Sequence, residues 1–523
     1  MSENVRQFVS KLVSAEALDS AKDFCLANGK SLAAATGAAV ALLYAARAYY
    51  RVYRLPPGPL GLPILGRLPW LDLKHLEESQ EKMRHQYGGI YSYRMGSRLM
   101  IVVSSYELLK EMLSEDVFSG RQLPPAAQRT AQDCGILFVE GRVWSEQRRV
   151  SLRVLRDFGF ARTESVEFIN EEICILMEKL EQQPTEVKVI DHFNALTNSV
   201  IAMLVFGRRY ANEDKRYEKF LENSKFLFDV GLLSELPFLF PYLSKLLSLL
   251  PMTRKIVKTV QDIQTFIEEE ITKREALISS DADAEGTCLC DAYIIERRNA
   301  EAKGDFETFK KFQLVRVSME LFVAGTDTTA KTLEWLMIHM AAFPEAQDNV
   351  QAEIHRVAGT ERQPQLSDKA QLHYTQAVID ESMRFASLAP NAISHRAIKD
   401  TYFRGYLIPA DAAIVPFLYG LHRNSKYWKR PHTFYPGHFL TEDGRYAPSK
   451  MLEPFCVGKR ACPGESLAKL EIFLTFTAIM QRYRVRFSRD YETKVDDILR
   501  GVCGLARDAG RTGWTLCDSE LRS

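Results

Sequence analysis

The sequence predicts a single large domain that is mainly α-helical with small β-sheets and that follows an N-terminal segment with a membrane anchor. Two observations predict the domain. Apolar residues recur at helical spacing through most of residues 105–350, and short β-rich runs lie before and after that stretch. The chain of 523 residues is 46% apolar and 26% charged, a composition that supports a large core. We expect the N-terminal segment at 1–54 and the domain at 55–523, because no convincing linker interrupts the latter.

The charge balance and the cysteines narrow the class of function and the compartment. The formal net charge is +1 at pH 7, so no global field indicates nucleic-acid binding. The nine cysteines are odd in number and show no disulfide framework, which favours a reducing compartment. Cys288 and Cys290 are too close for an ordinary disulfide, and they lack the second pair that a zinc site needs.

The stretch at 32–50 predicts a membrane anchor. It is about one bilayer span long, and Arg51 and Arg54 follow it directly. The arginines after the span predict that the bulk of the chain stays in the cytosol. Acidic residues before the span argue against a mitochondrial transit peptide. The alternative is a soluble amphipathic helix that packs on the domain, because the stretch is rich in alanine and contains Arg47.

The elements of the domain follow in chain order. The prolines at 55–59 predict a stiff, non-helical hinge. Two β-rich runs about a Gly-Ser turn predict a hairpin over 91–104, and the polar stretch at 279–287 predicts a surface loop. Strand-like runs return at 392–416, and a last apolar helix follows Cys462.

Cys462 is the cysteine whose sequence neighbours favour a reactive or metal-binding thiolate. It precedes a proline, Gly464 and an apolar run with helical spacing, so it lies just before a helix N-terminus, where backbone N–H groups favour a thiolate. Arg460 can add a cation there, and Gly458 permits a tight turn. Cys456 has none of these features, and its apolar neighbours favour a small buried side chain. An isolated thiolate cannot complete a zinc site, which leaves a nucleophile, an axial ligand to a metal held otherwise, or a structural cysteine.

Three further patterns place polar groups at helical spacing. The run AGTDTT at 324–329 puts poor helix formers inside a long apolar segment, where a tolerated kink is the alternative interpretation. Glu381 and Arg384 share a helix face at i, i+3, and most such pairs are exposed and contribute little. Trp144 and Arg148, at i, i+4, face the same way, and both can donate hydrogen bonds to an anion.

The run PFCVGKRACPGE resembles the cysteine-ligand loop of the cytochrome P450 family, Phe-x-x-Gly-x-Arg-x-Cys-x-Gly. The five fixed positions match at Phe455, Gly458, Arg460, Cys462 and Gly464. The other signatures occur in the family's order, so the resemblance covers the chain from about residue 55 onwards. The runs LPPGP, RDFGF and PGHFL are similar to those of the animal microsomal branch, which includes drug- and steroid-hydroxylating members.

The resemblance implies roles for the motif residues. Cys462 would be the axial ligand of the iron of haem b. Asp327 and Thr328 resemble the acid–alcohol pair that relays protons to dioxygen in the family. The donors to the haem propionates would be Arg121, Trp144, Arg148, His395 and Arg460.

The resemblance also implies a structural lock. Glu381 and Arg384 would be buried and would hold a later loop through His438, at a position where many members have arginine. Because histidine ionises near neutrality, we expect this lock to depend more on pH than an arginine lock would.

The implied activity is that of a haem-thiolate monooxygenase acting on a lipophilic small molecule such as a steroid, a fatty acid or a xenobiotic. Electrons would come from NADPH through a cytochrome P450 reductase, with cytochrome b5 as a second candidate partner, because no nucleotide-binding glycine fingerprint is evident. The protein would lie in the endoplasmic reticulum membrane with its domain on the cytosolic face. A thiolate-haem isomerase or lyase of the same fold, or a non-enzymatic haem-binding sensor, is the alternative.

The resemblance places two surfaces around the site. The substrate pocket would be lined by 122–137, 226–252, 389–393 and 501–503, and the apolar stretch 226–252 could touch the bilayer or pack in the core. The family docks its electron donor on the cysteine side, where positive charge steers acidic flavoproteins. The basic run there comprises Arg148, Arg149, Arg153 and Arg156.

Overall fold

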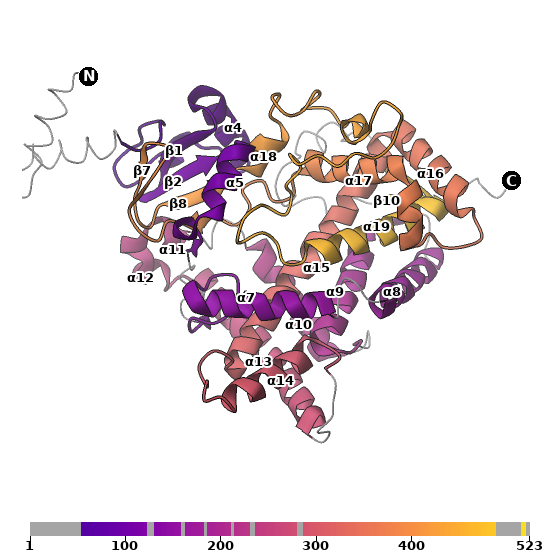
Figure 1. Ribbon diagram of the computed structural model, residues 1–523, viewed down its shortest axis with the longest axis horizontal. Helices are drawn as coiled ribbons and strands as arrows, with labels where there is room; N and C mark the ends of the chain where they lie inside the picture. Colours follow the sequence, from indigo (N-terminus) through magenta and orange to yellow (C-terminus); the bar gives the residue numbers. More distant parts are fainter. Residues whose placement is uncertain are drawn as a thin grey trace, which may run out of the picture.

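The structure is a computed structural model that describes the chain from residue 54, so the predicted anchor at 32–50 lies outside the described residues. The described residues are 54–122, 130–157, 163–182, 186–210, 214–230, 236–279, 286–487 and 514–518. Within them helices dominate and the strands form three small sheets, as the sequence predicts (Figure 1). Most of the predicted surface loop at 279–287 also lies outside them.

Long helices form the body of the molecule. Helix α15 (Lys311–Ala342) packs against α9 (Val189–Phe206), α13 (Pro251–Ser279) and α19 (Glu465–Arg482). The other helices that matter below are α5 (Tyr106–Ser114), α7 (Gly141–Leu155), α8 (Thr163–Glu181), α10 (Lys215–Asp229), α11 (Leu236–Leu239), α12 (Ser244–Leu247), α14 (Leu289–Glu301), α16 (Pro344–Ala358) and α17 (His373–Ala386).

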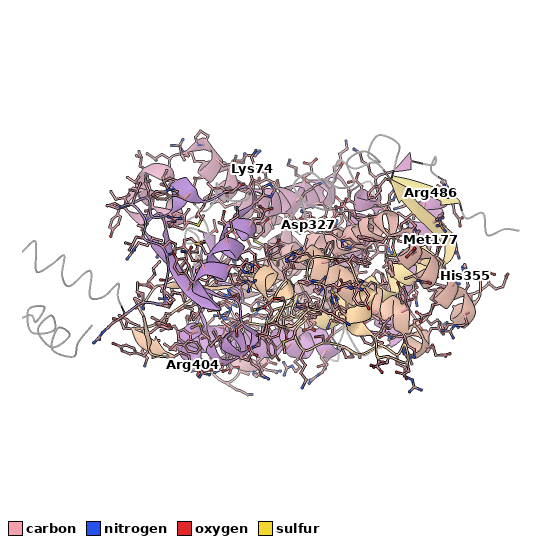
Figure 2. All side chains as sticks on the ribbon, turned by 90° about the horizontal axis from the view of Figure 1, so that it is seen from above. Lys74, Met177, Asp327, His355, Arg404 and Arg486 are labelled. Carbon is pink, nitrogen blue, oxygen red and sulfur yellow. The ribbon has the colours of Figure 1, made fainter. Side chains whose placement is uncertain are left out.

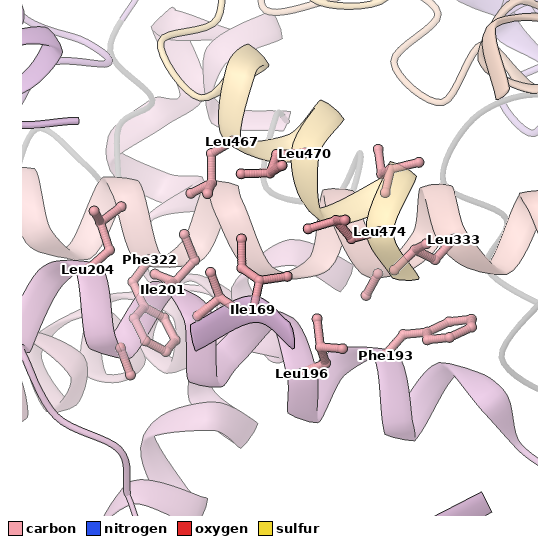
Figure 3. Packing of buried hydrophobic residues seen from close by; sticks show 14 of the residues in the cluster. Ile169, Phe193, Leu196, Ile201, Leu204, Phe322, Leu333, Leu467, Leu470 and Leu474 are labelled. Carbon is pink, nitrogen blue, oxygen red and sulfur yellow. The ribbon is translucent and has the colours of Figure 1, made fainter. Parts of the chain in front are cut away.

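The largest core lies where α15 meets α8, α9 and α19. Figure 3 shows apolar side chains of these helices gathered together, among them Leu333 of α15 and Leu470 of α19. Gly325 lets two of the helices approach closely, since a Cβ there would lie 2.7 Å from Cδ1 of Ile201 on α9. Within the described residues, α9 alone is long and apolar enough to cross a membrane, but most of it is buried in this core.

The sheets agree with the predicted strands and add four that the sequence did not predict, β3, β4, β9 and β10. The main sheet has the order β1-β2-β8-β5-β3, and the hairpin predicted over 91–104 is confirmed as its β1–β2 pair. The strands predicted at 392–416 are confirmed as β5 to β8. Strands β3 and β4 were not predicted; each has two residues and pairs only with a strand far along the chain, so no local pattern signals it. The strands are β1 (Ile90–Met95), β2 (Arg98–Val103), β3 (Gly120–Arg121), β4 (Glu186–Val187), β5 (His395–Arg396), β6 (Thr401–Phe403), β7 (Tyr406–Ile408), β8 (Ala413–Pro416), β9 (Tyr483–Phe487) and β10 (Trp514–Asp518).

Candidate active site

The loop that carries Cys462 is held in a tight turn against the end of α5. Gly458 has φ of +84°, and a Cβ there would lie 2.3 Å from the carbonyl oxygen of Leu113. The Lys459 N–H donates to that same oxygen at 3.2 Å, and the Cys462 N–H donates to the Phe455 carbonyl at 3.0 Å. The glycine of the motif is therefore required by a close backbone approach as well as by its left-handed conformation.

The Cys462 thiol stands just before α19, whose N-cap is Gly464, as the sequence predicts. The side chain is exposed, yet the protein atoms packed around it raise the pKa of the thiol by burial. The backbone N–H groups of Gly464 and Glu465 and the cation of Arg148 act in the opposite direction. The cation beside the thiol is thus Arg148, whereas the sequence pointed to Arg460, whose guanidinium turns elsewhere.

Cys456 lies in a different environment. It is partly buried against a second apolar core, and burial raises the pKa of its thiol to about 11. A thiol with this pKa is protonated at neutral pH, which agrees with the interpretation of Cys456 as a small apolar side chain.

Arg460 is buried among carbonyl groups and an indole ring. Its guanidinium donates to the Ser119 carbonyl at 3.0 Å and the Ile136 carbonyl at 3.1 Å, and its Cζ lies 3.9 Å from the centre of the Trp144 ring. Burial, followed by the nearby cation of Arg121, lowers the pKa of Arg460 to about 9. The carboxylates of Glu140 and Glu320 act in the opposite direction but do not offset the burial of this cation.

Arg121 and Arg148 complete the cluster. Arg121 donates to the backbone carbonyls of Ile393 and Ser394, and Arg148 donates to the Ala461 carbonyl at 2.6 Å. Burial is the main cause that lowers the pKa of Arg121 to about 10. Among the described residues, none of the three guanidiniums of Arg121, Arg148 and Arg460 forms an ion pair with a carboxylate.

His395 pairs with Arg121 across β3 and β5 and is buried. Its Nδ1 lies 2.8 Å from the Phe118 carbonyl oxygen, which can only accept, so Nδ1 carries the proton. Burial, together with the cations of Arg121 and Arg460, lowers the pKa of His395 to about 3. The neutral ring has no hydrogen on Nε2. It can donate to an anion there only when the charge of that anion raises the pKa of the ring enough for a second proton to bind.

The residues of this cluster fit a haem with two propionates. Nε of Arg121 and Nε1 of Trp144 are buried and have no hydrogen-bond partner. Two buried guanidiniums, those of Arg121 and Arg460, the half-buried one of Arg148 and an indole N–H without a partner among the described residues can together bind an anion with several acceptor oxygens. The cysteine that could serve as axial ligand lies beside Arg148.

Asp327 and Thr328 lie in the middle of α15, which continues without a break through 324–329. Asp327 is buried, and Figure 2 places it inside the body of the molecule. The Thr328 hydroxyl donates to the Ala324 carbonyl at 2.7 Å, so the helix satisfies this hydroxyl itself. Ala324 is exposed, which leaves this part of the helix surface open beside Thr328.

A buried carboxylate that the sequence reasoning missed ties α15 to the cation cluster. Glu320 accepts the N–H groups of Ile136 and Leu137 at 2.7 and 2.9 Å, and it pairs with Arg316 at 2.9 Å. The Ile136 carbonyl in turn accepts a hydrogen bond from the Arg460 guanidinium. The i, i+4 spacing of Arg316 and Glu320 could have indicated an ion pair on one helix face. Such pairs are common on exposed helix faces, so the spacing does not indicate that this one is buried.

The lock of Glu381, Arg384 and His438 is present as a buried network. Both oxygens of Glu381 accept from Arg384 at 2.7 Å, and both side chains are fully buried. Arg384 also donates to the carbonyls of His422, at 2.7 Å, and Pro431, at 2.8 Å, which brings two later segments to α17. This pair is therefore not one of the exposed pairs that contribute little.

His438 takes part in the lock as a neutral ring. Nε2 accepts the backbone N–H of Arg430 at 3.2 Å, so Nδ1 carries the proton and donates to Glu381 at 3.1 Å. A second proton on Nε2 would remove the bond from Arg430. The expected pH dependence of the lock has this geometric basis and stays a prediction.

The basic run on α7 points outward but is largely paired. Arg149 pairs with Glu146 at 2.9 Å, and Arg153 pairs with Glu296 of α14 at 2.8 Å. Only the part of the run at Arg148 turns inward, to the cysteine loop. The outward-facing charge available to a docking partner is thus smaller than the sequence alone indicated.

The predicted pocket lining is described only in part, because 123–129 and 501–503 lie outside the described residues. A cavity of about 530 Å³ opens beside Arg121 and is lined from the 130–139 segment by Ala131, Cys134 and Phe138. Cys462 and Thr328 do not line this cavity, so the predicted lining of the substrate pocket by 122–137 stays a prediction.

Comparison with known proteins matches this arrangement to one family. The family model described as Cytochrome P450 matches residues 56–509. The chain is 34% identical over 439 residues to Cytochrome P450 2B4 of Oryctolagus cuniculus, covering 83% of this chain and 88% of that protein. It is 35% identical over 436 residues to Cytochrome P450 2B2 of Rattus norvegicus, covering 82% and 87%, and 33% identical over 464 residues to Cytochrome P450 2H1 of Gallus gallus, covering 86% and 92%. The resemblance seen in the cysteine loop is therefore confirmed over most of the chain, and the chain belongs to the cytochrome P450 family.

Proposed function

We propose that the chain is a haem-thiolate monooxygenase that inserts one oxygen atom of O2 into a lipophilic small molecule, with electrons from NADPH through a partner reductase. One observation carries the proposal: the Cys462 thiol stands at the start of α19 beside Arg148, in a cluster with the buried Arg121 and Arg460, and no carboxylate among the described residues forms an ion pair with these cations. When bound, haem b would supply the activation of dioxygen, and a thiolate ligand favours cleavage of the O–O bond.

The residues of the chain would hold the cofactor and move protons. Cys462 would bind the iron, and the propionates would accept hydrogen bonds from the donor set of Arg121, Trp144, Arg148, His395 and Arg460. Thr328 keeps two lone pairs on Oγ1 after donating to Ala324, so it can order a water or accept a proton. Asp327, one position earlier, supplies a carboxyl that can release a proton and regain it from solvent.

We place the protein in the endoplasmic reticulum membrane, with the anchor at 32–50 and the domain on the cytosolic face. The relatives named above belong to an animal branch with microsomal members, which supports this location. Leu246 is 66% exposed and Leu249 58%, so part of the stretch 226–252 offers apolar surface rather than packing in the core. Resistance of the full-length chain to alkaline carbonate extraction is the expected result, and full extraction would contradict a transmembrane anchor.

Reconstitution of the full-length protein with haem and NADPH–cytochrome P450 reductase tests the activity. Steroids, fatty acids and xenobiotics are first screened for a shift of the haem absorption band, and then NADPH consumption and product mass are measured under ¹⁸O2. We expect consumption that rises with substrate and a product that carries one ¹⁸O atom. A product formed without O2 would instead identify an isomerase or lyase, and haem binding without any turnover would favour a sensor.

A further inference from the structure

The first turns of α15 carry three polar side chains within a mostly apolar run. Gln313, Arg316 and Glu320 are spaced i, i+3 and i+7, so they form a polar stripe on one face of the helix, and all three are buried. Burial of polar and charged groups costs free energy unless hydrogen bonds compensate it, so the partners of the polar stripe indicate its role. The function proposed above assigns no role to these three residues.

The polar stripe binds the backbone of the chain just before α7. Gln313 donates to the Gly135 carbonyl at 2.8 Å. Oε2 of Glu320 accepts the N–H groups of Ile136 and Leu137 at 2.7 and 2.9 Å. Gly135 has φ of +111°, and a Cβ there would clash with the Glu320 carboxylate, so this close approach requires glycine. Two consecutive peptide groups are thus held by side chains of one helix.

The second of these peptide groups also binds Arg460. The Ile136 carbonyl shares a rigid peptide plane with the Leu137 N–H, and it accepts from the Arg460 guanidinium at 3.1 Å. The Ser119 and Val139 carbonyls accept from the same guanidinium at 3.0 and 2.5 Å. These carbonyls orient the guanidinium and leave it further N–H groups that can donate to an anion. The planar peptide group therefore links the position of Arg460 directly to α15.

Arg316 neutralises Glu320 and so keeps Arg460 available to an anion from outside the chain. Arg316 donates to Oε1 of Glu320 at 2.9 Å, which leaves Oε2 to the two backbone N–H groups. The charge of Glu320 affects the pKa of Arg460 less than burial or the cation of Arg121 does. A carboxylate that paired with Arg460 would compete with an incoming anion, whereas Glu320 binds only the backbone that orients this cation.

We propose that Glu320 is a positioning residue for the cofactor: it fixes the peptide group after Ile136, whose carbonyl holds the Arg460 guanidinium in place to donate to a haem propionate. The inference rests on the proposed function, because it assumes a haem at the cation cluster. A donor that is already oriented binds an anion more tightly than one that is ordered only on binding. Loss of the acceptor at position 320 should therefore weaken haem retention although Arg460 itself is intact.

The test replaces both members of the buried pair, because removal of one alone leaves an uncompensated charge. In Arg316→Gln/Glu320→Gln, the amide oxygen at position 320 can still accept the two backbone N–H groups. In Arg316→Met/Glu320→Met, no acceptor remains at that position. Both double variants lack the buried charges and have side chains of similar size, so the acceptor distinguishes them.

The measured quantity is the rate at which the ferric holoprotein loses haem to excess apomyoglobin, which requires no turnover. We expect severalfold faster loss from the methionine variant and loss close to the wild-type rate from the glutamine variant. Hydrogen exchange at residues 136 and 137 should be faster in the methionine variant only. Haem loss from the methionine variant at the wild-type rate would overturn the proposal. Equally fast loss from both double variants would assign the effect to charge and would also overturn it.

A double-mutant cycle tests whether Glu320 acts through Arg460. Arg460→Gln removes a charge-assisted donor and should speed haem loss by about tenfold or more. If Glu320 acts by holding this guanidinium, adding Arg316→Met/Glu320→Met to Arg460→Gln should speed the loss little further. Effects that multiply in the combined variant would show that the two sites act independently, and the proposal would fall.

A second buried ion pair provides the matched control. Asp291 also accepts a backbone N–H, that of Thr287 at 3.0 Å, and pairs with Arg274, but this pair joins α13 to α14. Arg274→Met/Asp291→Met should leave the rate of haem loss unchanged, and faster loss there would reduce the effect at Glu320 to general destabilisation and overturn its specific role. A wild-type protein that binds no haem would overturn the proposed function, whereas a haem-bound wild type with a multiplicative cycle would overturn this inference alone.

Discussion

The side chains of the lock of Glu381, Arg384 and His438 are tied to distant segments, whereas the Thr328 hydroxyl on α15 bonds, within the described residues, only to its own helix. Arg384 is fully buried and donates to Glu381 and to carbonyls of later segments, among them that of His422. Thr328 donates to Ala324 one turn earlier, and the helix surface at Ala324 is exposed. The first region therefore holds the chain together, and the second offers groups to whatever lies against it.

This difference predicts which substitutions should lower the stability of the fold and which should lower turnover. A buried charge that loses its partner destabilises the fold strongly, because its desolvation is no longer compensated. A hydroxyl that bonds only within its helix contributes little to stability, so its removal leaves the fold nearly intact. Substitutions in the two regions should thus separate loss of the folded, cofactor-binding protein from loss of turnover.

The largest effect is expected at the ligand itself. Cys462→Ala removes the thiolate that stands at the start of α19, so the variant should lose the thiolate-type absorption band of the reduced carbon-monoxide complex completely. Cys456→Ala is the matched control six positions earlier, where burial already keeps the thiol protonated. The band should persist in the control, and the opposite pattern would overturn the assignment of the ligand.

The next effect is expected in the lock. Arg384→Ala leaves the Glu381 carboxylate buried without its partner, which should lower the free energy of unfolding by about 3–5 kcal/mol and reduce haem content. Arg356→Ala provides the comparison, because Arg356 forms the same i, i+3 pair with Glu353 on α16 but is 64% exposed and lies at 4.0 Å. That pair should contribute about 0–1 kcal/mol. Unfolding in urea checks both variants, and equal losses would show that burial does not distinguish them.

A smaller and different effect is expected on α15. Thr328→Ala should leave haem content and stability nearly unchanged but raise the NADPH consumed per product, because protons arrive at the wrong time or place. Asp327→Asn should mainly slow turnover, and removal of a positioned acid–base group costs about a hundredfold to ten-thousandfold in rate. We expect the lower end for Thr328, since water can replace its hydroxyl in part. Coupling and rate that match the wild type in both variants would leave these residues only a role in shaping the helix.

The sequence predicted those parts of the molecule that short contiguous patterns specify. The cysteine loop, the β1–β2 hairpin and the start of α19 each follow from a few neighbouring residues with a clear backbone requirement, such as the left-handed Gly458. Helical spacing likewise predicted a helix through 324–329, but the poor helix formers there favoured a kink, whereas α15 continues without a break.

The rest depends on contacts between distant segments, which no local pattern encodes. Glu320 reaches across 184 residues to the N–H of Ile136, and β3 exists only because it pairs with β5. The cation beside Cys462 is Arg148, more than 300 residues away, although Arg460 is the neighbour in sequence. Proximity along the chain was a poor guide to proximity in space for each of these groups.

The smallest effect concerns pH and the buried histidine next to the lock. His422 accepts the Glu453 N–H at Nε2, so its Nδ1 carries a proton and donates to Ser387 at 3.1 Å. Burial, followed by the cations of Arg384 and Arg423, lowers the pKa of His422 to about 3, whereas an unfolded histidine titrates near its ordinary value of about 6.5.

Between these two pH values the unfolded chain binds a proton that the folded protein does not. Stability from His422 is therefore fully present above about pH 6.5 and falls as the pH drops towards 3, with a slope of up to about 1.4 kcal/mol per pH unit. His422→Gln should be less stable than the wild type at pH 8, by about 1–3 kcal/mol, but should lose less stability between pH 6.5 and pH 5. His85→Gln, at a side chain that is 67% exposed, is the control and should keep the wild-type slope. Urea unfolding at each pH measures the slopes. A His422→Gln slope as steep as that of the wild type would mean that groups other than His422 govern the loss of stability in acid.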